Sequence, residues 1–342
     1  SLLEQSIYLN LNDVLTQLLK LELLLAETCE YSQCLMKQIG TNSSLSKSVT
    51  DYFIMKKMVS SEVSLAVQCL RRFVEFQKLP DDTHRLNSNI VRWIQRDSKT
   101  KELCFFSNDA HAGSIFQNNI MANVRSMILT SATLESMGNF DRFKRQLSIP
   151  ENKNMHTVNI KSPFDYSKSN LLLPVKFGDP NSSSHSVVVA EQLHFAAKKH
   201  KAILVLFCSY KQLNETLDNC TQSLQESILL QNKYSKAELI RLHKASINSG
   251  KLSILFGVDG LSEGIDLQGK YLTCVMITKL PFPNLSSAVN DFERTKVELE
   301  GGNSFHSISL PMCSIKLIQG VGRLVRSEND HGDVYILDPR VV

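Results

Sequence analysis

Apolar residues follow a helical period in the first part of the chain. Up to about Gln95 they recur every three or four residues, as in the stretches Leu11 to Leu19 and Val63 to Leu70, and this spacing predicts amphipathic helices. The polar segment Gly40 to Ser44 divides them into two helical blocks. The pattern changes near Lys101, where short continuous apolar runs begin.

The apolar runs predict strands. Leu103 to Phe106 and Val124 to Leu129 are the first two, with Ile115 to Met121 between them. After Pro150, strand-like runs alternate with helical stretches such as Ala237 to Ile247. The strands expected there are Ala202 to Phe207, Ile228 to Leu230, Leu252 to Phe256, Leu272 to Ile277 and Val334 to Leu337. This alternation predicts an α/β fold with a parallel sheet and helices on both faces.

Two arginines stand three residues apart in the segment Gln319-Gly320-Val321-Gly322-Arg323-Leu324-Val325-Arg326. A guanidinium is a planar fork of donors that stays charged at any working pH, which suits a γ-phosphate. At helical spacing both side chains would lie on one face. A basic surface helix held by salt bridges has the same composition, so the octet by itself leaves both interpretations open.

Two further segments carry candidate chemistry. Phe256 to Leu267 contains three glycines together with Ser262, Glu263 and Asp266, and it follows an apolar run. Backbone of this kind at the carboxyl end of a strand can approach a phosphate or a sugar closely, although a tight surface turn would look similar. Met127 to Leu134 is an apolar run, interpreted as a strand, that passes into small hydroxyl residues.

The order of these segments resembles superfamily 2 helicases, in which Ser131-Ala132-Thr133, Glu263-Gly264-Ile265-Asp266 and Gln319 to Arg326 would be motifs III, V and VI. The residue identities within six segments resemble the DinG branch of the XPD/DinG helicases. The matching segments are Thr130 to Leu134, Ser162 to Phe164, Val205 to Ser209, Ser262 to Gly269, Lys279 to Pro283 and Gln319 to Ser327. They cover the chain from about residue 100 to its end.

The resemblance implies three parts. Residues 1–97 would form a helical Arch-like domain, which the family inserts between motifs II and III. Residues 98–150 would be the C-terminal remnant of a first RecA-like domain, and residues 151–342 the second RecA-like domain. A generic helical bundle has the same signature as an Arch, so that assignment depends on position in the chain.

The resemblance also implies an activity, the ATP-dependent 5′ to 3′ unwinding of DNA in repair and replication, with single-stranded and forked DNA as partners. Arg323 and Arg326 would act as arginine fingers while Gln319 positions the nucleotide. The residues at the edge of the nucleotide would be Gly264, Asp266 and Gly322. Those that contact DNA phosphates would be Ser209, Gly260 and Ser262, and those that couple domain closure to DNA binding would be Thr130, Ser131 and Thr133.

Two elements of a helicase are missing from the sequence. It holds no Gly-x-x-x-x-Gly-Lys-Ser/Thr phosphate loop and no Asp-Glu-Ala-His box, and Asn108-Asp109-Ala110-His111 lacks the second carboxylate. We therefore expect the C-terminal part of a longer helicase, inactive alone, that binds ATP and Mg²⁺ together with the first RecA-like domain in cis. An iron–sulfur cluster would belong to the part upstream.

Composition changes this interpretation little. The formal net charge of +4 does not require a nucleic-acid partner. The eight cysteines form no Cys-x-x-Cys pairs, and Cys29 with Cys34 cannot supply four ligands, so we expect no metal site. The sequence shows no signal peptide at Ser1 and no apolar run that would span a bilayer, which leads us to expect a cytoplasmic protein without membrane contact.

Three alternatives remain at the level of sequence. One is an XPD-like helicase of transcription or repair, which the wording of Lys279 to Pro283 disfavours. Another is a DinG-type helicase fused to a nuclease. The third is an interaction module that kept helicase motifs without turnover. A phosphate loop upstream of Ser1 would separate the third from the other two.

Overall fold

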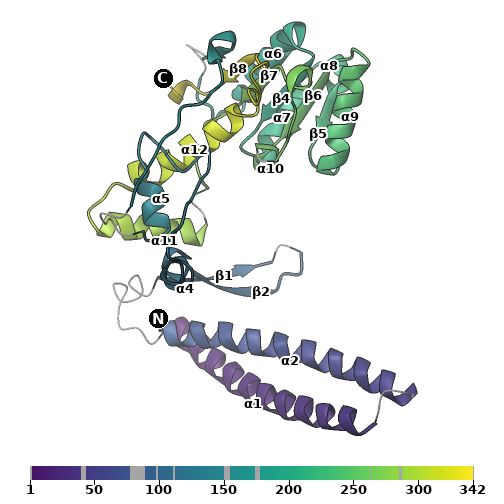
Figure 1. The fold of residues 1–342 in the computed structure, drawn as a ribbon, viewed down its shortest axis with the longest axis vertical. Coiled ribbons are helices and arrows are strands. Elements are labelled where there is room, and N and C mark those ends of the chain that lie inside the picture. Colours follow the sequence, from purple (N-terminus) through teal and green to yellow (C-terminus); the bar gives the residue numbers. More distant parts are fainter. Residues whose placement is uncertain are drawn as a thin grey trace. The chain divides into compact units, whose positions relative to one another are not determined.

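The computed structural model describes residues 2–39, 44–77, 89–97, 99–110, 112–149, 155–173, 178–262, 264–284 and 287–341. The chain divides into two compact units (Figure 1). Ser1–Ile115 and Leu285–Glu300 form the first, called here the hairpin unit. Phe116–Asn284 and Gly301–Val342 form the second, called the sheet unit.

The sheet unit is built on six strands in the order β3-β8-β7-β4-β6-β5. The strands are β3 (Asn170–Leu172), β4 (Ala202–Leu206), β5 (Ile228–Leu230), β6 (Ser253–Gly257), β7 (Cys274–Ile277) and β8 (Asp333–Ile336). All neighbouring pairs are parallel. The five strands expected from apolar runs are confirmed, and only the three-residue β3 was not anticipated, because it lies outside any long run.

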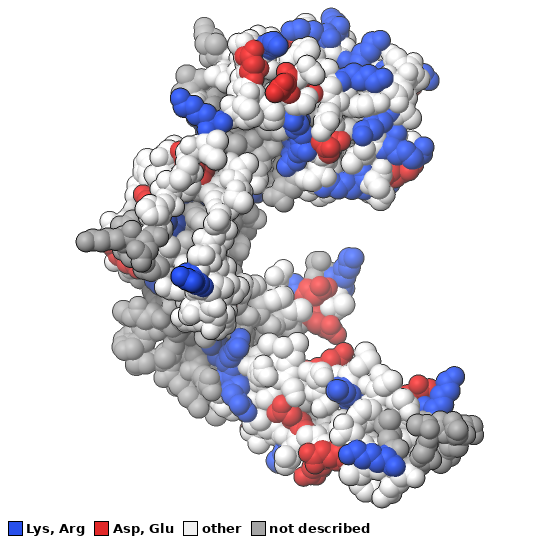
Figure 2. All heavy atoms as spheres, in the orientation of Figure 1, with Lys and Arg blue, Asp and Glu red and all other residues white. Residues whose placement is uncertain are grey.

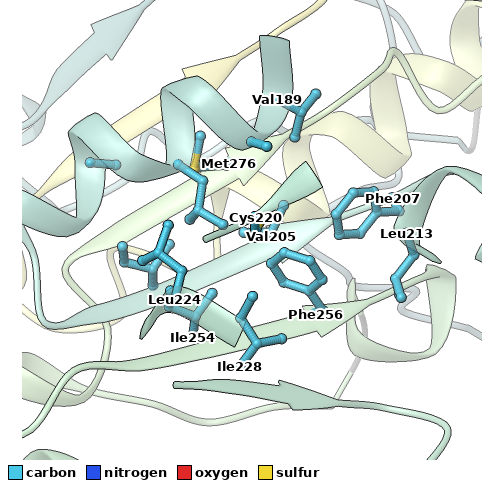
Figure 3. Packing of buried hydrophobic residues seen from close by; sticks show 14 of the residues in the cluster. Val189, Val205, Phe207, Leu213, Cys220, Leu224, Ile228, Ile254, Phe256 and Met276 are labelled. Carbon is cyan, nitrogen blue, oxygen red and sulfur yellow. The ribbon is translucent and has the colours of Figure 1, made fainter. Parts of the chain in front are cut away.

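Alternate side chains of the central strands enter two separate cores. Val205 of β4 and Phe256 of β6 belong to the core that α6, α7 and α8 cover, where the rings of Phe207 and Phe256 meet edge to face at 4.9 Å (Figure 3). Leu204 and Leu255, one residue earlier in each strand, belong to the core that α9 and α12 cover. Both faces of the sheet are therefore buried, as parallel sheets require.

The helices of the sheet unit follow the expected alternation. They are α5 (Asp141–Gln146), α6 (Ser184–Lys199), α7 (Tyr210–Asn219), α8 (Gln222–Gln225), α9 (Lys236–Asn248), α10 (Asp259–Ser262) and α12 (Leu310–Val321). Helix α9 matches the expected Ala237 to Ile247 closely. Ser209 and Ser235 begin α7 and α9 as N-caps, because their hydroxyls accept the free backbone N–H groups of Gln212 and Glu238. Helix α4 (Ala112–Asn119) spans the boundary between the two units.

The hairpin unit contains two long helices, α1 (Leu2–Ile39) and α2 (Ser44–Gln77), and an antiparallel pair, β1 (Ile90–Arg96) and β2 (Leu103–Asp109). Its buried core is small, with Leu15, Val67 and Val74 at the centre. The ring of Phe73 in α2 meets that of Phe105 in β2 edge to face at 5.6 Å, which attaches the helices to the strands.

Helix α11 (Ala288–Leu299) also belongs to the hairpin unit, although the chain reaches it between β7 and α12. It packs against β1, and Lys296 Nζ donates a hydrogen bond to Asn89 Oδ1 at 2.8 Å. Sequence reasoning did not identify this packing partner.

Two expectations about secondary structure are wrong. The apolar pattern predicts helix up to about Gln95, but residues Ile90–Arg96 form β1, whose register against β2 pairs Trp93 with Phe106. The predicted strand Val124 to Leu129 is irregular instead. Ile128 is 92% exposed, and the residues around it belong to no strand in the described part of the chain. Within the described residues, no helix has the length and apolarity to cross a membrane.

Candidate functional site

The segment Gln319 to Arg326 begins as the last turn of α12 and then leaves the helix. Gly320 packs so closely on the sheet that an added Cβ would lie 3.1 Å from Leu206 Cδ1 and 3.4 Å from Ile277 Cδ1. Helix α12 ends at Val321, and Gly322 caps it with a hydrogen bond from its N–H to the Ile318 carbonyl at 2.8 Å. The two arginines therefore lie beyond the helix, which corrects the expectation that helical spacing aligns them.

Tertiary contacts instead hold the two arginines against the segment Phe256 to Gly269, called here the glycine-rich loop. Arg323 Nη1 donates to the Ile265 carbonyl at 3.3 Å, and Arg326 Nη1 forms an ion pair with Asp266 Oδ1 at 3.0 Å. The Arg326 side chain is 27% exposed and that of Asp266 is 64% exposed, so the pair stands at the surface where a ligand could reach it. Two guanidinium groups that contact neighbouring residues of one loop are a donor set suited to phosphate oxygens.

A buried carboxylate, Asp330, fixes the backbone of the same two segments. Asp330 Oδ1 accepts the N–H of Gly269 at 2.7 Å, and Oδ2 accepts those of Arg326 at 2.9 Å and Ser327 at 2.8 Å. Burial alone would raise the pKa of this carboxyl, but the hydrogen bonds outweigh it and hold the pKa below its usual range. Sequence reasoning missed Asp330, because its partner Gly269 lies far away in the chain.

The glycine-rich loop depends on backbone conformations that favour glycine. Gly264 and Gly269 have φ angles of 66° and 59°. A Cβ at Gly264 would also lie 2.9 Å from Lys236 Nζ, whose ammonium donates to the Gly260 carbonyl at 3.3 Å. Lys236 is a second neighbour that the sequence did not identify. Glu263 lies outside the described residues.

The residues expected to hold DNA phosphates lie at the carboxyl edge of the sheet. Ser209 follows β4, while Gly260 and Ser262 lie in α10, which follows β6. The Ser209 hydroxyl already accepts the Gln212 N–H at 3.2 Å as the α7 N-cap. Gln231, after β5, supports α10 through a hydrogen bond from the Val258 N–H to its Oε1 at 2.8 Å. Three adjacent strands thus bring these segments together.

Thr130, Ser131 and Thr133 lie in irregular chain, and the expected strand before them is absent from the described structure. The Thr133 N–H donates to Ser131 Oγ at 3.2 Å, which forms a local turn. Thr130 and Ser131 line an open groove of about 420 Å³ together with Ile318 of α12. Gln319 is the next residue of that helix and is half-buried. The groove therefore places the Thr130 segment beside α12.

Metal-binding chemistry is not evident in the part of the chain that is described, where no three His, Cys, Asp or Glu side chains gather as ligands. All eight cysteines are free thiols. Burial raises the pKa of Cys220 and of Cys313 to about 11, so these thiols behave as small apolar side chains.

The sheet unit is an α/β domain with a parallel sheet, two buried sheet faces and loops gathered at the carboxyl edge of the sheet. Residues 192–342 match the family model described as the helicase C-terminal domain. Two solved structures titled as XPD in its apo form and as XPD helicase share the fold, with TM-scores of 0.55 and 0.54. Both are 18% identical and cover 88% of this chain, which in turn covers 59% and 53% of theirs.

Proteins of similar sequence indicate the type of helicase. The chain is 34% identical over 258 residues to the ATP-dependent DNA helicase DinG of Photobacterium profundum, and 30% identical over 261 residues to that of Escherichia coli K12. These alignments cover 74% of this chain but only 37% and 36% of the relatives. The chain thus carries a helicase C-terminal domain of the DinG/XPD type and spans little more than a third of its curated relatives.

Proposed function

We propose that this chain supplies the nucleotide-responsive, DNA-gripping C-terminal part of an ATP-dependent 5′ to 3′ DNA helicase that acts in DNA repair or replication. The observation that carries the proposal is the contact between Gln319 to Arg326, called here the arginine segment, and the glycine-rich loop. Arg323 and Arg326 contact Ile265 and Asp266 by side chain, and Asp330 ties the same segments by backbone. A force on the arginines would be transmitted directly to the loop next to Gly260.

The residues of this chain are suited to contact the phosphates and one edge of ATP. Arg323 and Arg326 offer charged donors for phosphate oxygens, Gln319 would position the nucleotide, and Gly264, Asp266 and Gly322 would form its edge. The Mg²⁺ ligands and the phosphate loop would come from a first RecA-like domain in cis, since residues 1–342 contain no phosphate-loop or Asp-Glu-Ala-His sequence. ATP bound between the two domains would supply the driving free energy, and an iron–sulfur cluster would lie in that upstream part.

The grip on DNA is assigned to the carboxyl edge of the sheet. Ser209, Gly260 and Ser262 would contact phosphates of single-stranded or forked DNA without reading bases, and Thr130, Ser131 and Thr133 would link that grip to domain closure. In the same proposal, residues 1–97 form an Arch-like domain, residues 98–150 complete the first RecA-like domain and residues 151–342 form the second. A cytoplasmic location stays a prediction.

The proposal is tested by phosphate release. The chain alone, at micromolar concentration and with or without single-stranded DNA, should show no ATP hydrolysis above a buffer blank. The full-length protein with a phosphate-loop domain should hydrolyse ATP in a DNA-stimulated manner. ATP hydrolysis by the chain alone that survives repurification would contradict the proposal that hydrolysis requires the first RecA-like domain. A full-length protein that binds DNA but never hydrolyses ATP would favour the interaction-module alternative.

A further inference from the structure

Two exposed tyrosines flank α10 at the carboxyl edge of the sheet. Tyr210 is the first residue of α7, four residues after β4 ends at Leu206, and is 43% exposed. Tyr234 lies in the turn after β5 and is 41% exposed. Because β4, β6 and β5 are adjacent parallel strands, their carboxyl ends meet at one edge, with α10 in the middle.

Each tyrosine has a lysine beside it in the chain. Lys211 follows Tyr210, and its side chain is 86% exposed with a long, weak ion pair to Glu215 at 3.9 Å. Lys233 precedes Tyr234 and is exposed. Lys236 joins this group to α10 through its hydrogen bond to the Gly260 carbonyl at 3.3 Å. Figure 2 shows basic side chains in excess over acidic ones on the visible face of the sheet unit around α7 to α9.

Aromatic rings with lysines beside them fit single-stranded nucleic acid. Any base can stack on a tyrosine face, and ammonium groups neutralise phosphates without selecting a sequence. Neighbouring strands are about 4.8 Å apart, so the ends of β4 and β5 are roughly 10 Å apart. That span corresponds to about three nucleotides of a stacked strand. Duplex DNA hides its base faces and could not use both rings.

We propose that Tyr210 and Tyr234 form a two-ring stacking platform that holds single-stranded DNA across α10, with Lys211, Lys233 and Lys236 on its phosphates. The platform rests on the proposed DNA function of this edge and gives it a specific chemistry. It fixes bases on either side of the loop that the arginine segment controls. Movement of α10 relative to β4 and β5 would then shift the α10 backbone between the two rings.

Binding of a fluorescent dT20 oligonucleotide by the chain tests the platform. Tyr210→Ala and Tyr234→Ala should each weaken binding at least about fivefold, the lower end of the effect of removing one base–aromatic stack. Tyr→Phe at either position should restore binding to within about twofold of the parent, because the ring remains. Both residues are surface positions, and thermal melting should match the parent.

Phe195 provides a matched control. It is 59% exposed and has Lys198 Nζ over its ring at 5.3 Å, but it lies near the end of α6, away from the carboxyl edge. Phe195→Ala should leave binding unchanged. Lys233→Ala should reduce the slope of log affinity against log salt by about 0.7, the value for one phosphate on a single strand. Lys251→Ala, just before β6 at the opposite edge, should not.

A second readout locates the bases directly. Photo-crosslinking with an oligonucleotide that carries 5-iododeoxyuridine should label Tyr210 and Tyr234, identified by mass spectrometry. If the parent chain binds no dT20, both this inference and the DNA function of the edge are overturned. If the parent binds and both Tyr→Ala variants bind equally well, only the platform is wrong. Tighter binding of rU20 than of dT20 would overturn the assignment to DNA.

Discussion

The carboxylate of Asp330 accepts a hydrogen bond from the backbone N–H of Gly269 at 2.7 Å, although 61 residues separate them in the chain. Its second oxygen accepts the N–H groups of Arg326 and Ser327. One buried side chain therefore fixes the end of the glycine-rich loop and the backbone of an arginine in a single geometry. A disturbance of either segment must reach the other through this group.

Replacing Asp330 by alanine should destabilise the sheet unit. Three backbone donors would lose a charged acceptor in a buried place, and unsatisfied donors cost about 1–3 kcal/mol. We expect the free energy of unfolding in urea to fall by about that amount. Glu328→Ala, two residues earlier and exposed, is the control and should change it by less than about 0.5 kcal/mol. Equal stability of the two variants would show that the three hydrogen bonds contribute nothing net.

Arg323→Ala or Arg326→Ala in the full-length protein should lower kcat for DNA-stimulated ATP hydrolysis by about a thousandfold or more, the scale of an arginine finger. Arg→Lys should restore little, because an ammonium cannot reproduce the planar fork. Steady-state ATPase rates measure the effect, and thermal melting checks the fold.

Arg241 supplies the comparison for these variants. It forms a surface ion pair with Glu238 at 2.7 Å, and exposed pairs contribute little, so Arg241→Ala should leave turnover nearly intact. If the Arg323 and Arg326 variants also keep rates within about threefold of the parent, the finger assignment fails.

Stability should fall in acid as Asp333 takes up a proton. This nearly buried carboxylate accepts hydrogen bonds from Lys199, Asn170 and His200, and they outweigh the effect of burial and lower its pKa to about 2. A pKa that is lower in the folded state contributes stability that is complete above the unfolded value. That stability is lost as the pH falls from about 4 towards 2.

The Asp333→Asn variant isolates this contribution. Relative to the parent, it should lose on the order of 2 kcal/mol near pH 7, and the difference should shrink as the pH approaches 2. Urea unfolding across this pH range measures both. A difference that is the same at pH 7 and at pH 2.5 would assign the loss to geometry and not to charge.

The Ser209 hydroxyl should matter more to α7 than to DNA. Because it caps the helix, Ser209→Ala should cost about 0.5–2 kcal/mol of stability, and Ser209→Asn, another good cap, should cost less. Binding of dT20 should weaken only modestly in both, since backbone N–H groups would carry most of the grip. A large loss of binding in Ser209→Asn, without a loss of stability, would show that the hydroxyl itself contacts DNA.

The sequence alone determined the sheet unit well. Strands such as Ala202–Leu206 and Ser253–Gly257 are mostly apolar, because a parallel sheet buries both of its faces. The order of the three motif segments likewise identified the helicase type, which the sequence matches confirm. These properties are local in the chain or depend only on order along it.

Tertiary structure decided what depends on partners distant in the chain. Val124 to Leu129 has the composition of a strand, yet a strand exists only when another one supplies its hydrogen bonds, and none of the described residues does so. Ile90–Arg96 became a strand because Leu103–Asp109 pairs with it. Arg323 and Arg326 left the helix at Gly322 and are aligned by Ile265 and Asp266 instead. The spacing of residues in the sequence cannot predict those contacts, because they form only when the carboxyl ends of separate strands meet at one edge of the sheet.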